Sequence, residues 1–262
     1  MMNEYGTYLY AVARDTGHAC PEGLLGVAGT PVRAIPQAGL VAYVSTVPLD
    51  RFGAEPLRES MEDLDWLSET ARAHHHVVEA VAEDQPAVPV RLVTVYSGDE
   101  QIRELLSRRH DDFAEVLTRI AGRQEWGVKA YVDLAAAVAE EQAVEAGGPG
   151  AAYLRRRQAS LHGREEAWRQ AAAFAERIHD ALSTVAIASR RHRAQDPQLS
   201  GRTELMILNG AYLVERDRGE EFARLVDEQR GQGADVELTG PWVPYSFTDL
   251  ADPAEPEVLG DG

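Results

Sequence analysis

Tyr5-Gly6-Thr7-Tyr8-Leu9-Tyr10-Ala11-Val12-Ala13-Arg14 is rich in aromatic and aliphatic side chains, a composition that favours a β-strand. Glycines and prolines between Gly17 and Pro31 predict a loop after this stretch. Two short strands are expected next, at Val32–Ile35 and Leu40–Thr46, and Gln37-Ala38-Gly39 between them is typical of a hairpin turn. The chain is therefore predicted to begin with a strand followed by a β-hairpin.

Two helical patterns enclose the next predicted strand, Val88–Tyr96. Apolar residues recur at the spacing of one buried helical face from about Pro56 to Ala82 and again from Asp99 to Ile120. Residues 1–122 are thus predicted to form one α+β domain. The positions expected to be buried are Leu57, Met61, Leu64, Leu67, Ala71, Val78 and Val81 in the first helix, Val90, Leu92 and one of Val93 and Val95 in the strand, and Ile102, Leu105, Leu106, Phe113, Val116, Leu117 and Ile120 in the second helix.

A second domain is expected over residues 123–248, with elements in the order β-α-β-β-α-β that is typical of a ferredoxin-like fold. This order implies an antiparallel sheet with helices on one face, so the predicted fold class is α+β with two domains. Residues 249–262 are acidic and are expected to be a disordered tail. The predicted elements are a strand at Trp126–Val132, a loose alanine- and glycine-rich stretch at Leu134–Gly150, a helix at Ala151–Leu182, strands at Thr184–His192 and Glu204–Val214, a helix at Arg218–Arg230 and a strand at Ala234–Thr239.

The long helix predicted at Ala151–Leu182 carries an apolar residue at every seventh position, at Leu154, Leu161, Trp168, Ala175 and Leu182. Such a stripe packs either on a sheet or on another helix. Packing on the sheet of its own domain is the favoured interpretation.

The formal net charge is −17 on 262 residues. A polyanionic surface repels nucleic acid and anionic lipid, so we expect neither nucleic acid nor membrane as a partner. The single cysteine, Cys20, excludes an intrachain disulfide. No apolar run is long enough to cross a bilayer and the first residues lack the pattern of a signal peptide, so the expected location is cytoplasmic.

Two stretches of the second half are distinctive: Glu125-Trp126-Gly127-Val128-Lys129 and Gly240-Pro241-Trp242-Val243-Pro244-Tyr245-Ser246-Phe247. Further short motifs occur at Tyr8–Val12, Gly23–Val32, Asp65–Leu67, Ala73-His74, Val90–Tyr96, Tyr153-Leu154 with the three arginines after it, Tyr212–Val214 and Leu238-Thr239. Together and in this order, over about residues 5 to 247, they resemble the gas vesicle protein F/L family. Leu92-Val93 stands where family members often carry Phe-Gly, and Val243 where Pro is common, so the choice between F-like and L-like stays open.

The resemblance implies a molecule of two α+β domains, the second a modified ferredoxin-like fold. It also implies an accessory or minor structural protein of the gas vesicle rather than an enzyme, with no cofactor and no catalytic residue. The implied partners are the major gas vesicle shell protein, which is small and hydrophobic, and other gas vesicle accessory proteins. The implied location is the gas vesicle.

The triplet His74-His75-His76 suggests a metal site, but consecutive helical side chains point about 100° apart and cannot converge on one ion. Only Glu79, four residues after His75, is spaced to assist, so no metal site is predicted. His74 lies on the apolar stripe, where we expect a hydrogen-bonded structural histidine.

No other motif predicts catalysis or a cofactor. The run Gly23, Gly26 and Gly29 lacks the lysine of a phosphate-binding loop and does not connect a strand to a helix, so these glycines are expected to form turns. Glu62, Asp63 and Asp65 are expected near the start of a helix, where carboxylates favour the helix dipole.

Two basic clusters and one aromatic segment are the candidate partner-binding residues. The clusters, Arg155-Arg156-Arg157 and Arg190-Arg191-His192-Arg193, either form ion pairs with surface acids or mark an interface. The aromatic residues Trp242, Tyr245 and Phe247 either dock back onto the protein between the two domains, which is favoured, or anchor a partner.

The favoured function is the binding and masking of the shell protein, which limits its aggregation during nucleation. Strand addition at a sheet edge and a helix in a groove are the two modes considered. The alternatives are a dimeric ferredoxin-like enzyme of the monooxygenase type, which bound haem or flavin would reveal, and a ligand-sensing module, which a thermal shift with metabolites would reveal.

Overall fold

A computed structural model describes residues 4–17, 20–133, 152–195, 202–231 and 234–248, with side chains of residues 152–164 excepted. The fold is α+β and contains two four-stranded antiparallel sheets. The chain divides into two compact units, one of Met1–Gly122 together with Val243–Gly262 and one of Arg123–Trp242. Residues 243–248, which the sequence assigned to the second domain, therefore group with the first unit. None of the helices in the described ranges is long and apolar enough to cross a bilayer.

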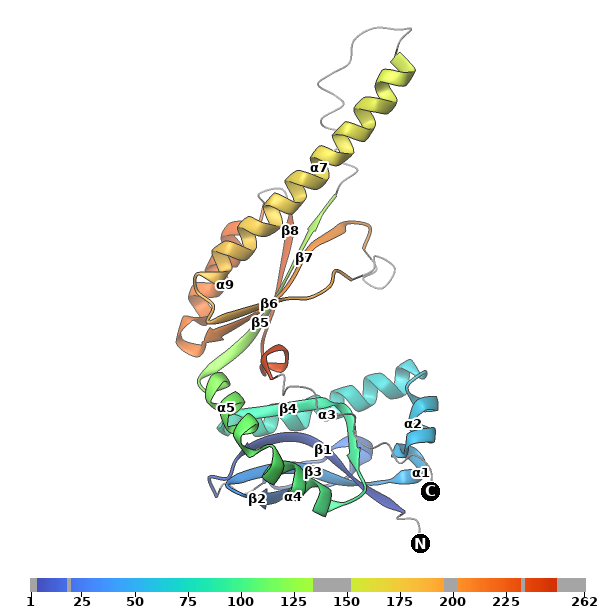
Figure 1. Ribbon diagram of the computed structural model, residues 1–262, viewed down its shortest axis with the longest axis vertical. Coiled ribbons are helices and arrows are strands. Elements are labelled where there is room, and N and C mark those ends of the chain that lie inside the picture. The colour runs from blue at the N-terminus through green and yellow to red at the C-terminus, as the bar shows by residue number, and fades with distance from the viewer. Residues whose placement is uncertain (1–3, 18–19, 134–151, 196–201, 232–233, 249–262) are drawn as a thin grey trace. The chain divides into compact units, whose positions relative to one another are not determined.

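The first unit has the strand order β2-β3-β1-β4 (Figure 1). The hairpin expected around Gln37-Ala38-Gly39 is present, with positive φ at Ala38 and Gly39. The elements are β1 (Tyr5–Arg14), η1 (Val27–Gly29), β2 (Val32–Gln37), β3 (Leu40–Pro48), α1 (Leu49–Phe52), α2 (Ala54–Ser60), α3 (Leu64–Asp84), β4 (Ala87–Tyr96), α4 (Asp99–Arg108), α5 (His110–Ile120) and η3 (Tyr245–Phe247).

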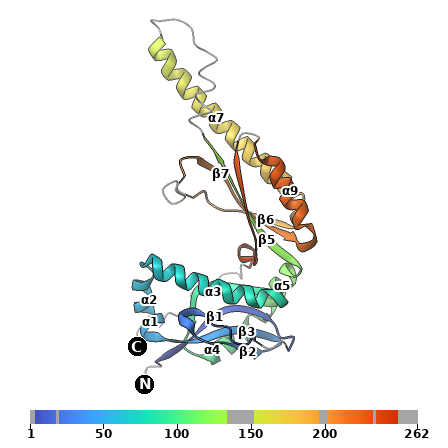
Figure 2. The ribbon, with the colours of Figure 1, turned by 180° about the vertical axis from the view of Figure 1, so that it is seen from behind.

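Strand β1 is the central element of this unit, because eight of its ten residues are buried. Tyr8 and Tyr10 belong to the core cluster that contains Val77 of α3, whereas Leu9 belongs to the cluster that contains Phe113 of α5. Figure 1 looks onto α4 and α5, and Figure 2, from behind, looks onto α3. Helices thus cover both faces of the first sheet, which explains why β1 shows no polar alternation.

The single helix predicted from Pro56 to Ala82 is wrong, because the chain breaks after α2 and restarts at α3. The Asp63 carboxylate accepts hydrogen bonds from the N–H groups of Asp65, at 2.9 Å, and Trp66, at 3.2 Å. These bonds make Asp63 the N-cap of a new helix. Met61 and Leu64 flank this break and are exposed, contrary to prediction.

The helix predicted at Asp99–Ile120 is also divided, into α4 and α5, at Arg109. Its predicted buried face is nevertheless confirmed. All seven expected positions are buried in one cluster on the sheet: Ile102, Leu105, Leu106, Phe113, Val116, Leu117 and Ile120.

Strand β4 does not keep the alternation that its sequence predicts. Its pairing with β1 runs from Ala13↔Ala87 to Ala11↔Pro89 and resumes only at Leu9↔Thr94. The intervening residues 90–93 leave the ladder, and Val93 has a positive φ of 62°. Val90 and Leu92 are consequently half-buried rather than buried, because this bulge turns them out of the regular sheet.

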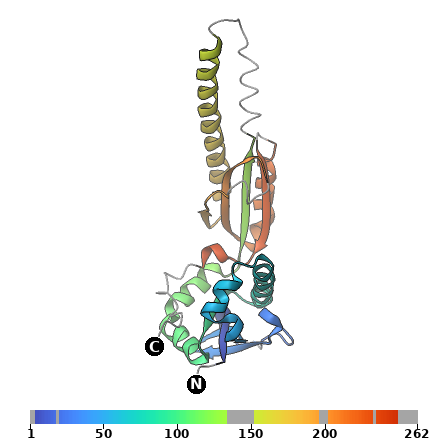
Figure 3. The ribbon, with the colours of Figure 1, turned by 90° about the vertical axis from the view of Figure 1, so that its right-hand side faces the viewer.

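The second unit has the expected order β-α-β-β-α-β and the strand order β6-β7-β5-β8. Its two long helices, α7 and α9, lie on one face of the sheet (Figures 1 and 3). The elements are β5 (Arg123–Val132), α7 (Ala152–Ser183), β6 (Ala188–Arg191), β7 (Leu205–Glu215), η2 (Arg216–Arg218), α9 (Gly219–Gln229) and β8 (Asp235–Trp242). The stretch predicted to be loose, Leu134–Gly150, lies outside the described residues, as does the tail 249–262.

Helix α7 packs on the sheet of its own unit, as the favoured interpretation held. Phe174, Ala175, Ile178 and Leu182 belong to one cluster with the inner residues of β5 and β7. Trp168 does not, because its side chain is 52% exposed. The packed residues are three to four positions apart from Phe174 and Ala175 to Ile178 and Leu182, so one face of the helix lies on the sheet.

Candidate functional site

A buried hydrogen-bonded chain of atoms joins β1, α3 and β4. The Tyr8 hydroxyl lies 3.0 Å from Nδ1 of His74 and accepts the N–H of Val93, also at 3.0 Å. His74 is only 2% exposed, and burial lowers the pKa of its imidazole to about 4. Burial likewise raises the pKa of the Tyr8 hydroxyl, so both groups are uncharged near neutral pH. The expected hydrogen-bonded structural histidine is thus confirmed.

The second tyrosine of β1 organises the loop before β2. Tyr10 donates from its hydroxyl to Ser45 Oγ at 3.0 Å and accepts the N–H of Val27 at 2.9 Å. A Cβ atom placed on Gly26 would lie 2.0 Å from the same hydroxyl. Gly26 is therefore required by the close approach of the loop to Tyr10, which agrees with a structural role for the glycine run.

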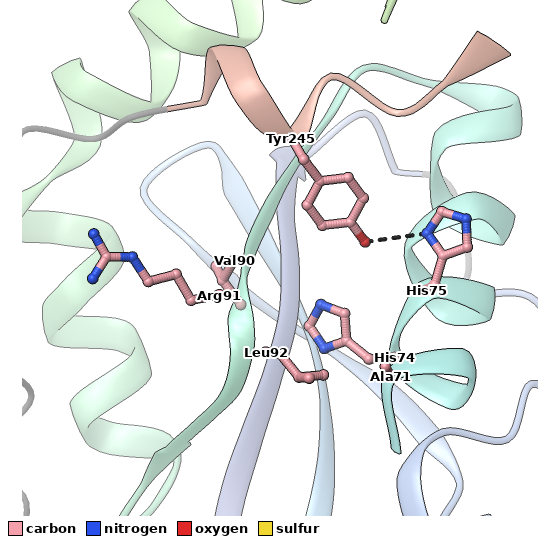
Figure 4. A pocket seen from close by; sticks show the side chains of 7 residues that line it. All are labelled: Ala71, His74, His75, Val90, Arg91, Leu92 and Tyr245. Carbon is pink, nitrogen blue, oxygen red and sulfur yellow. Dashed lines mark hydrogen bonds between the residues drawn. The ribbon is translucent and has the colours of Figure 1, made fainter. Parts of the chain in front are cut away.

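Helix α3, strand β4 and η3 line an open cavity of about 280 Å³. Figure 4 shows Tyr245 above the His74 ring, with the Arg91 side chain directed away from both. The Tyr245 hydroxyl lies 3.4 Å from Nδ1 of His75. The residues that line the cavity are Ala71, His74, His75, Val90, Arg91, Leu92 and Tyr245.

The three consecutive histidines point in different directions, as helix geometry requires. His74 is buried against Tyr8, and His76 is exposed. His75 lies between the Tyr245 hydroxyl and the Glu79 carboxylate, whose Oε1 is 3.1 Å from His75 Nε2. Within the described residues, no group of His, Cys, Asp and Glu is arranged to hold a metal ion.

The aromatic segment near the C-terminus divides between the two units. Phe247 is buried, with 6% exposure, and docks in the first unit, whereas Tyr245 is 36% exposed. Trp242 ends β8 in the second unit and is 43% exposed. Phe247 thus docks back onto the first unit itself, and Tyr245 does so in part.

The arginines of the second cluster lie at a sheet edge. Arg190 and Arg191 belong to β6, which pairs with β7 and with no other strand of the described ranges, and Arg193 follows two residues later. All three side chains are exposed. Arg191 forms a bidentate ion pair with Glu176 of α7, with both N–O distances at 2.6 Å, as the ion-pair alternative expects. The first cluster, Arg155-Arg156-Arg157, lies on α7 where side chains are outside the described residues.

The cavity residues Ala71, Val90 and Leu92 were not predicted as site residues. Their sequence pattern is that of ordinary core positions. Val90 and Leu92 lie in the bulge of β4, and Ala71 of α3 lines the same space. The positive φ of Val93 has no signal in the sequence, since β-branched residues disfavour that region.

The family model described as "Gas vesicle synthesis protein GvpL/GvpF" matches residues 6–249, which is nearly the whole chain. The chain belongs to the gas vesicle GvpL/GvpF family.

Two relatives from Streptomyces sp. (strain CB03234) are similar to this GvpL/GvpF chain over most of its length. Gas vesicle protein L is 44% identical over 250 residues, which cover 94% of this chain and 93% of the relative. Gas vesicle protein F of the same organism is 27% identical over 93% of this chain and 99% of its own length.

Two solved structures share the fold. The gas vesicle protein GvpF from Anabaena sp. PCC7120 superposes with a TM-score of 0.71 at 19% identity, over 95% of this chain and 98% of that one. The GvpF of Microcystis aeruginosa gives a TM-score of 0.66 at 20% identity, over 94% and 99%.

Proposed function

We propose that this chain is an accessory protein of gas vesicle assembly that binds the small hydrophobic shell protein and other accessory proteins in the cytoplasm. In this role it limits aggregation of the shell protein during nucleation and has no catalytic activity. The observation that carries the proposal is the family match over residues 6–249. The net charge of −17 supports it, because a soluble polyanion can keep an apolar partner dispersed.

Two finer assignments accompany this proposal. We propose an L-like member, supported by 44% identity to a protein L against 27% to a protein F of the same organism. We also propose that the second unit is a ferredoxin-like domain. Its element order and its antiparallel strand order, with the first and third strands adjacent in the middle, support this assignment.

Edge strand β6 is the surface that we propose for one contact with the partner. Ser189, Arg190 and Arg191 are exposed, and one side of β6 is not paired with another described strand. A row of main-chain groups of this kind can accept an added strand. Arg190, Arg191 and Arg193 would then contact the partner beside the added strand.

Co-expression with the major shell protein of the same organism, followed by pull-down, tests the proposal. Wild-type protein is expected to keep the shell protein in the soluble fraction and to pull it down. The triple variant Arg190→Ser, Arg191→Ser and Arg193→Ser is expected to pull down less shell protein.

Arg51→Ser, Arg58→Ser and Arg72→Ser, exposed on α1, α2 and α3, form the matched control because they remove three charges elsewhere. Folding of each variant is checked by circular dichroism. Failure of correctly folded wild type to bind or disperse the shell protein contradicts the proposed function. Equal retention by the triple variant contradicts only the role of the β6 edge.

A further inference from the structure

The cavity lined by α3, β4 and η3 is much larger than a site for a single water molecule. Its volume is about 280 Å³, whereas a site for one buried water needs only about 10–15 Å³ on a comparable measure. Ala71, Val90, Leu92 and the ring of Tyr245 supply mostly apolar walls (Figure 4). A space of this size and lining favours an apolar group over a single bridging water.

One polar atom in this wall, Nε2 of His74, has no hydrogen-bond partner. The Tyr8 hydroxyl accepts the Val93 N–H, and its own proton is then available to Nδ1 of His74. That arrangement leaves Nδ1 as the acceptor and puts the ring proton on Nε2. The Val90 carbonyl interacts with the ring and favours its protonation, but no acceptor forms a hydrogen bond of good geometry with Nε2. His74 therefore presents a buried N–H donor that is at best weakly satisfied, and a ligand that supplies a well-placed acceptor would recover that free energy.

A neutral acceptor suits the Nε2–H donor of His74 better than a charged one. A carboxylate would lose its hydration in an apolar cavity beside an uncharged imidazole, and the nearby Glu79 carboxylate would repel it. An amide carbonyl has a lower cost of desolvation and is the acceptor that every peptide unit carries.

The cavity lies where an extended chain can approach. Strand β4 is at the edge of the first sheet, and its residues 90–93 are already out of the ladder with β1. Tyr245 covers the cavity on the other side and is held to His75 by a long hydrogen bond of 3.4 Å. Nε2 of His74 is shielded from solvent, so a ligand reaches it when Tyr245 moves aside. The long hydrogen bond between Tyr245 and His75 is weak and is easily replaced.

We propose that this space, the His74 cavity, binds an apolar side chain of an extended peptide segment of the shell partner. A neighbouring main-chain carbonyl of that peptide accepts the hydrogen bond from His74 Nε2, and Tyr245 acts as the movable cover. The inference rests on the proposed function, because that function supplies the apolar partner.

Fluorescein-labelled, overlapping 15-residue peptides that span the shell protein are the probe, and fluorescence anisotropy is the measurement. Ala71→Leu fills the cavity from its wall without altering His74 and is expected to weaken binding of the best peptide by about tenfold or more. Tyr245→Ala removes the cover and is expected to tighten it. His76→Leu adds the same side chain at an exposed position of α3 and is expected to leave the affinity unchanged.

Nuclear magnetic resonance of ¹⁵N-histidine-labelled protein gives a second readout that does not depend on the cavity variants. The free protein is expected to show His74 protonated at Nε2, and the Nε2–H proton resonance is expected to move downfield when the peptide binds. A ring protonated at Nδ1, or a resonance that the bound peptide leaves in place, overturns the inference.

The outcomes separate the two proposals. If the intact shell protein binds wild type and Ala71→Leu equally, and Ala71→Leu melts like wild type, the His74 cavity is not the site and the proposed function stands. If neither the peptides nor the intact shell protein binds wild type, the proposed function fails and the cavity assignment fails with it.

Discussion

Asp99 shows how one side chain at the residue scale holds three elements together. Its carboxylate accepts two hydrogen bonds from Arg33 of β2, at 2.8 and 2.7 Å, and one from the Thr7 hydroxyl of β1 at 2.9 Å. Asp99 is also the first residue of α4. The hydrogen bonds from Arg33 are the main reason that the pKa of Asp99 is below its ordinary value. The helix start is thus attached to the sheet by charge-assisted bonds.

Asp99→Asn is expected to lower the free energy of unfolding near neutral pH. The difference between variant and wild type is expected to become smaller in acid. Because the folded-state pKa of Asp99 is depressed, its contribution is present above the unfolded-state pKa and is lost as pH falls through the folded-state pKa. Urea unfolding at about pH 7 and about pH 3 measures the difference between variant and wild type. A difference that is equally large at both pH values would contradict the role of the ionised carboxylate.

Gly26→Ala is expected to destabilise the first unit by about 1–3 kcal/mol, because the added methyl overlaps the Tyr10 hydroxyl. Gly98→Ala is the control, since Gly98 has an extended backbone and no atom within 4 Å of the added Cβ. Calorimetric melting of both variants measures the effect. Equal melting temperatures for the two variants would count against the close packing of the loop on Tyr10.

At the element scale, the ends of helices and the bulge of β4 decide which residues face inward. Asp63 restarts the helix at α3, and this break leaves Met61 and Leu64 exposed. The bulge in β4 has a comparable effect, because it removes residues 90–93 from the ladder and opens the His74 cavity. Both features are local departures from a regular apolar period.

Asp63→Ala is expected to cost about 0.5–2 kcal/mol, since the N–H groups of Asp65 and Trp66 lose their acceptor. Glu62→Ala serves as the control because Glu62 is exposed and precedes the cap. Equilibrium unfolding in urea compares the two variants. A cost for Glu62→Ala as large as for Asp63→Ala would indicate a general charge effect instead of a cap.

At the scale of the whole molecule, the chain leaves the first unit at Gly122 and returns to it at Val243. Val243 packs against the core cluster of β1 and α3, and Phe247 is buried after it. The first unit is therefore completed by residues that follow the entire second unit in the sequence. Such long-range contacts carry a cost in loop-closure entropy that buried apolar area must offset.

Phe247→Ala is expected to destabilise the first unit by about 3–5 kcal/mol through loss of a buried ring. Hydrogen exchange with mass spectrometry resolves where the effect falls. Faster exchange is expected in peptides from α3 and β4, with unchanged exchange in β5, β7 and α9. The reverse pattern would show that the segment supports the second unit instead.

The sequence alone determined the α+β class, the approximate positions of the strands, and the buried faces of α4 and α5, but not where the helices of the first unit break. These features follow from local periodicity and turn chemistry, and Leu106 or Phe113 needs no distant partner to be recognised as apolar. The ordered motifs also indicated the family that the match over residues 6–249 establishes.

Only the tertiary structure decided that residues 243–248 join the first unit, that Trp168 faces solvent and that Ala71, Val90 and Leu92 meet His74 in one cavity. Each of these facts depends on contacts between residues that are far apart in the chain. A periodic pattern specifies which side of an element is apolar, but the partner that covers that side is chosen by the free energy of the whole packed molecule.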